Sequence, residues 1–174
     1  VLVPISPIFA ITFFAVVSIQ LGAMEGPHRP VMAYANFIAG AANVQFFIMP
    51  GLLWCVAAFR PDRPPEITSA LNDLAWIVAI LPWPITFIQM VVCGLAILKH
   101  AGRNPVFPRW AGFFNLWGAL IFIPGSLLPF FKTGPFAWNG LLSFWLPGTI
   151  FGIWYIVMQV LVLKAIKREP DVAG

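Results

Sequence analysis

Charged residues are scarce in this chain: Asp, Glu, Lys and Arg make up 9% of its 174 residues, against roughly 25% in soluble domains. Hydrophobic residues make up 60%, and the mean hydropathy is +0.89. A chain with so little charge cannot cover its apolar surface in water, which excludes an ordinary soluble domain. The net charge of +4 comes from Lys and Arg in loops and the tail, so it indicates membrane topology and no nucleic-acid partner.

The residue patterns that usually carry chemistry are also missing. Cys55 and Cys93 form no CxxC pair, and His28 and His100 lie in loops without the spacing of a metal or haem site. No serine or cysteine nucleophile stands beside a base, and no glycine-rich phosphate loop occurs. We therefore predict no catalytic residue, no metal and no cofactor, and expect a lipid or another lipophile as the only small molecule.

Long apolar runs are what the chain has, and they predict an all-α integral membrane protein. About 20 apolar residues cross a bilayer, so residues 1–174 form one domain with a bundle of about five transmembrane helices. No basic residue precedes the first run, which favours a span over a signal peptide. The expected spans are about 7–23, 31–59, 71–98, 110–131 and 140–163, followed by a charged tail at 164–174.

The distribution of basic residues predicts the orientation. Five spans place seven of the ten Lys and Arg residues on one side and three on the other. Because cytoplasmic loops carry the excess of basic residues, we expect a cytoplasmic C-terminus and an outside N-terminus. The membrane would be of the bacterial inner (plasma) type.

Prolines interrupt most of the predicted spans. Pro-Gly pairs begin at Pro50, Pro124 and Pro147, and Pro82 interrupts a fourth span. From the rise of an α-helix, all four breaks lie ~10–14 Å below the outer boundary. We expect several helices kinked at Pro or Pro-Gly at a common depth, each with a freed carbonyl that needs a donor.

One predicted helix face combines an acid with aromatic residues. Helical spacing places Asp73, Trp76, Trp83 and Phe87 within one arc of the third span. An acid inside a span often marks a functional site, whereas an Asp at the headgroup level is a structural feature favoured by the helix dipole. With the in-span amides, the candidate ligand-binding residues are Asp73, Trp76, Trp83, Phe87, Asn43 and Asn115.

Small residues mark faces for helix packing. Gly40 lies on one face of the second span, and Gly148 and Gly152 form a GxxxG pattern in the fifth. Glycines at this spacing let two helix backbones approach closely in a membrane.

In size, number of spans and tryptophan content the chain resembles the tryptophan-rich sensory/translocator family, which binds porphyrins and sterols. None of that family's Trp- and Pro-rich motifs aligns with a stretch of this chain, so no residue role is carried over.

The leading functional hypothesis is a non-catalytic accessory or structural subunit of a larger membrane complex. Its partners would be the lipid bilayer and other membrane subunits. One alternative is a lipophile-binding or transport protein with an aromatic pocket inside the membrane. A second alternative is a membrane enzyme on a lipid-like substrate, with Asp73 as the acid or base.

Overall fold

The computed structural model describes residues 7–60, 62–100 and 106–168, and all the elements in these residues are helices. The α-helices are α1 (Pro7–Glu25), α2 (Val31–Ala58), α3 (Pro65–Ile80), α4 (Trp83–Lys99), α5 (Arg109–Ile121) and α6 (Leu146–Ile166). Two short segments differ: η1 (Ile123–Phe130) is a 3₁₀-helix, and η2 (Leu141–Trp145) is a π-helical turn. The predicted all-α class is confirmed for the described residues.

Four helical stretches are long and apolar enough to cross a membrane. They are Val31–Ala58, Pro65–Lys99, Arg109–Phe130 and Leu141–Ile166. The stretch at α1 is shorter, with 19 residues in the helix, just under the ~20 that a perpendicular crossing needs. Four of the five predicted spans thus correspond to helices long and apolar enough to cross a membrane; the third begins at Pro65, earlier than the predicted 71, and the first falls short of that length.

Three of the four predicted proline breaks are departures from the α-helix. Leu81 and Pro82 form a turn between α3 and α4, Pro124 lies in η1, and Pro147 follows the π-helical turn η2. Proline lacks an N–H and its ring clashes with the preceding turn, so such departures are expected. Pro50 is the exception, because α2 remains helical on both sides of it.

The turn between α1 and α2 is held by an acid. Gly26 has a φ of +81°, which ends α1 in the left-handed conformation that glycine adopts freely. The Glu25 carboxylate then accepts hydrogen bonds from the backbone N–H groups of Met32 (3.1 Å) and Ala33 (2.8 Å). These are N–H groups of the first turn of α2 that have no partner within the helix. Glu25 therefore caps α2 and fixes the two helices side by side.

Helices α4 and α5 approach each other closely at two glycines. A Cβ on Gly94 would lie 2.9 Å from the carbonyl oxygen of Gly112, and a Cβ on Gly112 would lie 2.6 Å from Leu98 Cγ. A Cβ at Gly94 would press on backbone, which cannot give way cheaply, and a Cβ at Gly112 would press on the Leu98 side chain. The pair fixes the distance between the two helices.

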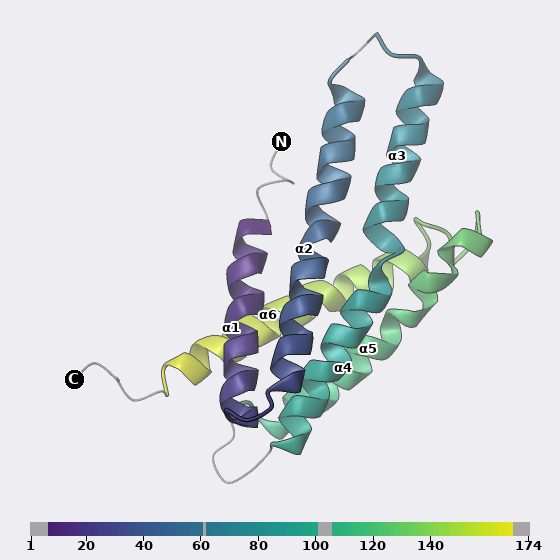
Figure 1. Cartoon of the computed structure of the whole chain (residues 1–174). Coiled ribbons are helices and arrows are strands. Elements are labelled where there is room, and N and C mark those ends of the chain that lie inside the picture. The colour runs from purple at the N-terminus through teal and green to yellow at the C-terminus, as the bar shows by residue number, and fades with distance from the viewer. Residues whose placement is uncertain (1–6, 61, 101–105, 169–174) are drawn as a thin grey trace.

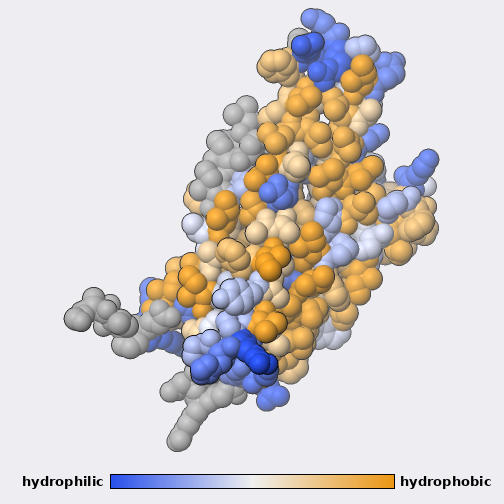
Figure 2. All heavy atoms as spheres, viewed as in Figure 1, coloured by the Kyte–Doolittle hydropathy of each residue, from blue (hydrophilic) through white to orange (hydrophobic). Residues whose placement is uncertain are grey.

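The helices divide into two regions. Figure 1 shows α1, the first half of α2, α4, α5 and α6 packed together, with α6 crossing behind the others. The second half of α2 and α3 extend beyond them as a two-helix hairpin. We call the first region the bundle and the second, about residues 49–80, the hairpin. Figure 2 shows an apolar surface over both, with hydrophilic residues at the hairpin tip and at the opposite end.

Candidate functional site

Asp73, the acid of the predicted site, lies on the surface of the hairpin. Its side chain is exposed on α3, and no residue in the described part of the chain forms a hydrogen bond or ion pair with it. The break at Leu81 and Pro82 ends α3, so Asp73 and Trp76 belong to a different helix from Trp83 and Phe87. The predicted face is therefore divided between the hairpin and the bundle.

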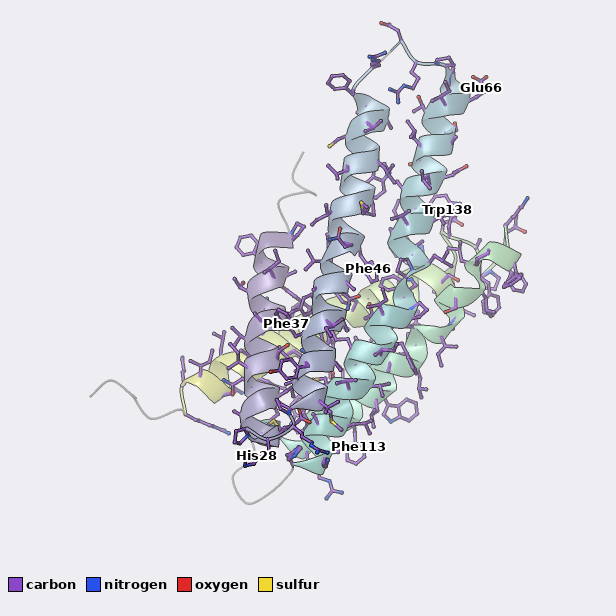
Figure 3. The ribbon with its side chains drawn as sticks, viewed as in Figure 1. His28, Phe37, Phe46, Glu66, Phe113 and Trp138 are labelled. Carbon is purple, nitrogen blue, oxygen red and sulfur yellow. The ribbon has the colours of Figure 1, made fainter. Side chains whose placement is uncertain are left out.

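Trp76 lies in an aromatic cluster where the hairpin joins the bundle. Its ring centroid is 5.2 Å from that of Trp54 on α2, 5.1 Å from Trp138 and 5.3 Å from Phe144. Figure 3 shows Trp138 beside the lower half of α3. Trp54 also donates from its indole Nε1 to Asn72 Oδ1 at 3.2 Å. This cluster is the junction between the two regions.

Trp83 is buried among aromatic rings from three other parts of the chain. Its ring centroid lies 4.9 Å from Phe122, 6.3 Å from Phe46 and 6.5 Å from Phe151. A Cβ on Gly125, in η1, would lie only 2.2 Å from Trp83 Cδ1, so this glycine makes room for the indole. The indole ring is therefore in contact with neighbouring residues on all these sides.

The indole N–H of Trp83 supplies a donor to a carbonyl that proline frees. In a regular α-helix the N–H of residue 147 would bond to the carbonyl of Ser143, but Pro147 has no N–H. Trp83 Nε1 donates to that carbonyl at 3.1 Å. The Ser143 hydroxyl in turn donates to the carbonyl of Phe136 at 2.9 Å. The turn at Pro82 and the segments η1 and η2 therefore meet at Trp83. Phe87, one turn further along α4, packs half-buried against the core.

Asn43 belongs to a polar network in the middle of the bundle. Its Nδ2 donates to Gln89 Oε1, and Thr86 Oγ1 donates to Asn43 Oδ1 at 2.9 Å. All three side chains are fully buried. The network joins α2 to α4, and the spacing of three between Thr86 and Gln89 places both on one face of α4.

Asn115 forms a second buried network, between α5 and α6. Its Oδ1 accepts from Trp154 Nε1 at 2.8 Å, and its Nδ2 donates to the carbonyl of Ala111 at 2.8 Å. The Nδ2 also lies 3.5 Å from the sulfur of Met158. The amide thus satisfies an indole that would otherwise be buried without an acceptor.

The three predicted packing glycines differ in what surrounds them. Gly40 is buried, and a Cβ there would lie 2.7 Å from Phe14 Cβ on α1. Gly148 and Gly152 are exposed on α6, and a Cβ at either position would meet nothing within 4 Å. Of these three glycines, only Gly40 brings two described helices together.

An apolar groove of about 280 Å³ lies between α1 and α2. Figure 3 shows Phe37 at this seam. Two buried polar atoms near the groove have no hydrogen-bond partner in the described part of the chain, Asn36 Oδ1 and Gln89 Nε2. No pattern in the sequence indicates this groove beyond the small residues that line it. Its lining residues are Ile11, Phe14, Ala15, Phe37, Gly40, Ala41 and Val44.

Among the described residues, no group of three or more His, Cys, Asp or Glu side chains could hold a metal ion. A comparison of the chain with known protein families, curated proteins and solved structures finds no match.

Proposed function

We propose that this chain is a multi-pass membrane protein that acts as a non-catalytic accessory subunit of a larger membrane assembly. The four long apolar helices and α1 would cross the bilayer, and the basic residues support a cytoplasmic C-terminus. The α1–α2 turn, the end of α4, the start of α5 and the end of α6 gather at one end of the molecule (Figure 1). Arg29, Lys99, Arg109 and Lys164 are exposed there.

The main evidence for this proposal is the outer face of α6. Gly148 and Gly152 lie one turn apart on this face with open space at both Cβ positions. Ile156 and Val160 continue the face as exposed apolar residues, 64% and 45% accessible. The result is a smooth apolar strip along most of the helix.

Glycine inside a helix is unfavourable unless it permits a close contact. Each one destabilises a helix by about 1 kcal/mol relative to alanine. At Gly94 and Gly112 a close contact between α4 and α5 offsets this loss, but no contact with another described residue does so at Gly148 and Gly152. In membranes, glycines four residues apart are typical of helix–helix interfaces. A helix of another subunit supplies the missing contact.

The test is gentle purification from native membranes, followed by mass spectrometry of the proteins that remain bound. We expect a stoichiometric membrane protein with the wild-type chain and its loss in the double variant Gly148→Leu, Gly152→Leu. A Cβ at either position would meet no described residue within 4 Å, so the variant should fold normally. The matched control is Ala23→Leu, the same kind of enlargement at an exposed position of α1. A wild-type chain without a partner, or a partner kept by the double variant, would contradict the proposal.

A further inference from the structure

We propose that the basic end of the bundle, where α4 ends and α5 begins, binds an anionic phospholipid. Lys99 is the last residue of α4 and Arg109 is the first of α5, and both side chains are exposed. The sequence between them adds Arg103 and contains no Asp or Glu. The site uses none of the residues of the α6 face, so it goes beyond the accessory role and depends only on the proposed insertion of the bundle in a bilayer.

Two glycines place the two cations at nearly the same level of the bundle. A Cβ on Gly94 would lie 2.9 Å from the carbonyl oxygen of Gly112, so α4 and α5 are in close contact there. Lys99 follows Gly94 by about 7.5 Å along α4, and Arg109 precedes Gly112 by about 4.5 Å along α5. Because the two helices are antiparallel (Figure 1), the two backbone positions differ in level by only about 3 Å.

The acids of the described chain do not neutralise these cations. Neither Lys99 nor Arg109 forms an ion pair with a described residue. Glu25 is the one described acid at this end, and both of its carboxylate oxygens already accept from backbone N–H groups of α2. Four further exposed cations lie at the same end, Arg29, Lys164, Lys167 and Arg168.

The two ends of the molecule therefore differ in charge. Six described cations and one acid give the basic end a net charge of +5. The hairpin and the loop between η1 and η2 together hold three cations and three acids, which leaves a net charge of 0. An anionic ligand is thus favoured at the first end and not at the second.

A phosphodiester with net negative charge is the headgroup chemistry that fits. Its oxygens accept hydrogen bonds from both Lys and Arg. Phosphatidylcholine also has a phosphate, but its quaternary ammonium would face cations and find no free acid at this end. Each Lys or Arg near an anionic lipid strengthens binding about fivefold, so the charge of the lipid should dominate the preference.

The outward face of α5 supplies the apolar part of the site. Trp110, Phe113 and Trp117 are 54%, 48% and 69% accessible, and their spacing of three and four places them on one face. The guanidinium carbon of Arg109 lies 5.9 Å from the centroid of the Phe113 ring, which Figure 3 shows at the same end of the molecule as His28. Trp110 fits the headgroup level that tryptophan prefers, and an acyl chain lies along the other two rings.

The experiment is native mass spectrometry of the full chain in detergent micelles, titrated with dioleoylphosphatidylglycerol or dioleoylphosphatidylcholine. The two lipids have the same acyl chains and differ in the headgroup. We expect phosphatidylglycerol to bind about 10- to 30-fold more tightly, because two cations contribute about fivefold each. The double variant Lys99→Gln, Arg109→Gln should reduce this preference to under about threefold.

Two control variants separate a site from general charge and from misfolding. Lys164→Gln, Lys167→Gln removes two exposed cations at the end of α6 and should keep most of the preference. Lys99→Arg, Arg109→Lys conserves the charge at the proposed site and should keep it as well.

Three results would overturn the proposal. The first is equal affinity for the two lipids in the wild-type chain. The second is an equal loss of preference in the two Gln double variants, which would show a diffuse positive field and no site. The third is displacement of the lipid by an equal concentration of inorganic phosphate, because the acyl chains would then contribute nothing. The Gly148→Leu, Gly152→Leu variant retains all these cations, so the lipid preference and the recovery of a partner protein can fail separately.

Discussion

The bundle and the hairpin use similar residue types in opposite ways. In the bundle, Asn43 and Asn115 are fully buried and form hydrogen bonds that join different helices. In the hairpin, Asp73 is exposed without a partner in the described part of the chain. Buried amides therefore fix the position of one helix against another inside the bundle, whereas the Asp73 carboxylate of the hairpin remains accessible to water, lipid headgroups or another molecule.

The junction between the two regions explains how they can differ within one chain. Helix α2 belongs to both, since its first half packs in the bundle and its second half in the hairpin (Figure 1). On the other side, Leu81 and Pro82 interrupt the helix between α3 and α4. The rings of Trp54, Trp76 and Trp138 then join the base of the hairpin to the bundle. One continuous helix and one broken helix thus connect the regions.

The largest effect on stability should come from removing a buried amide of the bundle. Asn115→Leu leaves the indole N–H of Trp154 without an acceptor, and we expect the free energy of unfolding to fall by about 2–3 kcal/mol. Chemical unfolding in detergent micelles, followed by tryptophan fluorescence, would measure it. Asn72→Leu removes an amide that pairs with Trp54 in the half-buried hairpin, and it should cost under about 1 kcal/mol.

A double variant separates the hydrogen bond from the packing. Trp154→Phe removes the donor as well, so Asn115→Leu should cost less in that background than in the wild-type chain. Equal costs in the two backgrounds would mean that the Asn115–Trp154 bond adds nothing to stability.

A smaller effect is expected from exchanging one indole for a phenyl ring in each region. Trp83→Phe removes the donor to the Ser143 carbonyl, which Pro147 deprives of its helical partner, and should cost about 1–2 kcal/mol. Trp54→Phe loses the same side-chain volume and the hydrogen bond to Asn72, but at a half-buried site, so it should cost less. The measurement is again unfolding in micelles. A larger loss for Trp54 would show that the hairpin, not the bundle, depends more on its indole.

Much of the fold could be predicted from sequence because hydropathy and proline act locally. The predicted spans at 31–59 and 110–131 agree with Val31–Ala58 and Arg109–Phe130 to within one residue at each end. The breaks at Pro82, Pro124 and Pro147 were also predicted, since proline in a helix interior removes a backbone N–H and its ring clashes with the preceding turn. Pro50 shows the limit, because α2 continues through it as a helix.

The candidate site was harder to predict because it depends on contacts between distant segments. Helical spacing placed Asp73 and Trp83 on one face, but the turn at Leu81 and Pro82 separates them. The bond from Trp83 to the Ser143 carbonyl joins residues 60 positions apart, and no local pattern identifies that partner. The one feature of the sequence that pointed to this bond was that Pro147, four residues after Ser143, has no N–H to donate. The close contact of Gly94 with Gly112 gave no signal, since neither lies in a GxxxG pattern.

The smallest effect on stability is expected for Asp73→Asn. Asp73 is exposed and has no partner among the described residues, so its neutral isostere should change the free energy of unfolding by less than about 0.5 kcal/mol. Recovery of a partner protein should also be unchanged if docking occurs through the α6 face. Unfolding in micelles and purification from native membranes, applied to the same variant, measure both quantities.

Purification of this variant from native membranes decides which region binds other molecules. If Asp73→Asn loses the partner while its stability is unchanged, the docking surface lies on the hairpin and not on α6. The partner would then carry a cationic group, because an unpaired carboxylate on an apolar helix needs a counter-charge in a membrane. A drop in lipophile affinity or in turnover would instead favour one of the two alternatives in which Asp73 contacts a ligand or substrate. If neither binding nor stability changes, the carboxylate is a solvated group at headgroup level, and the bundle with its α6 face carries the function.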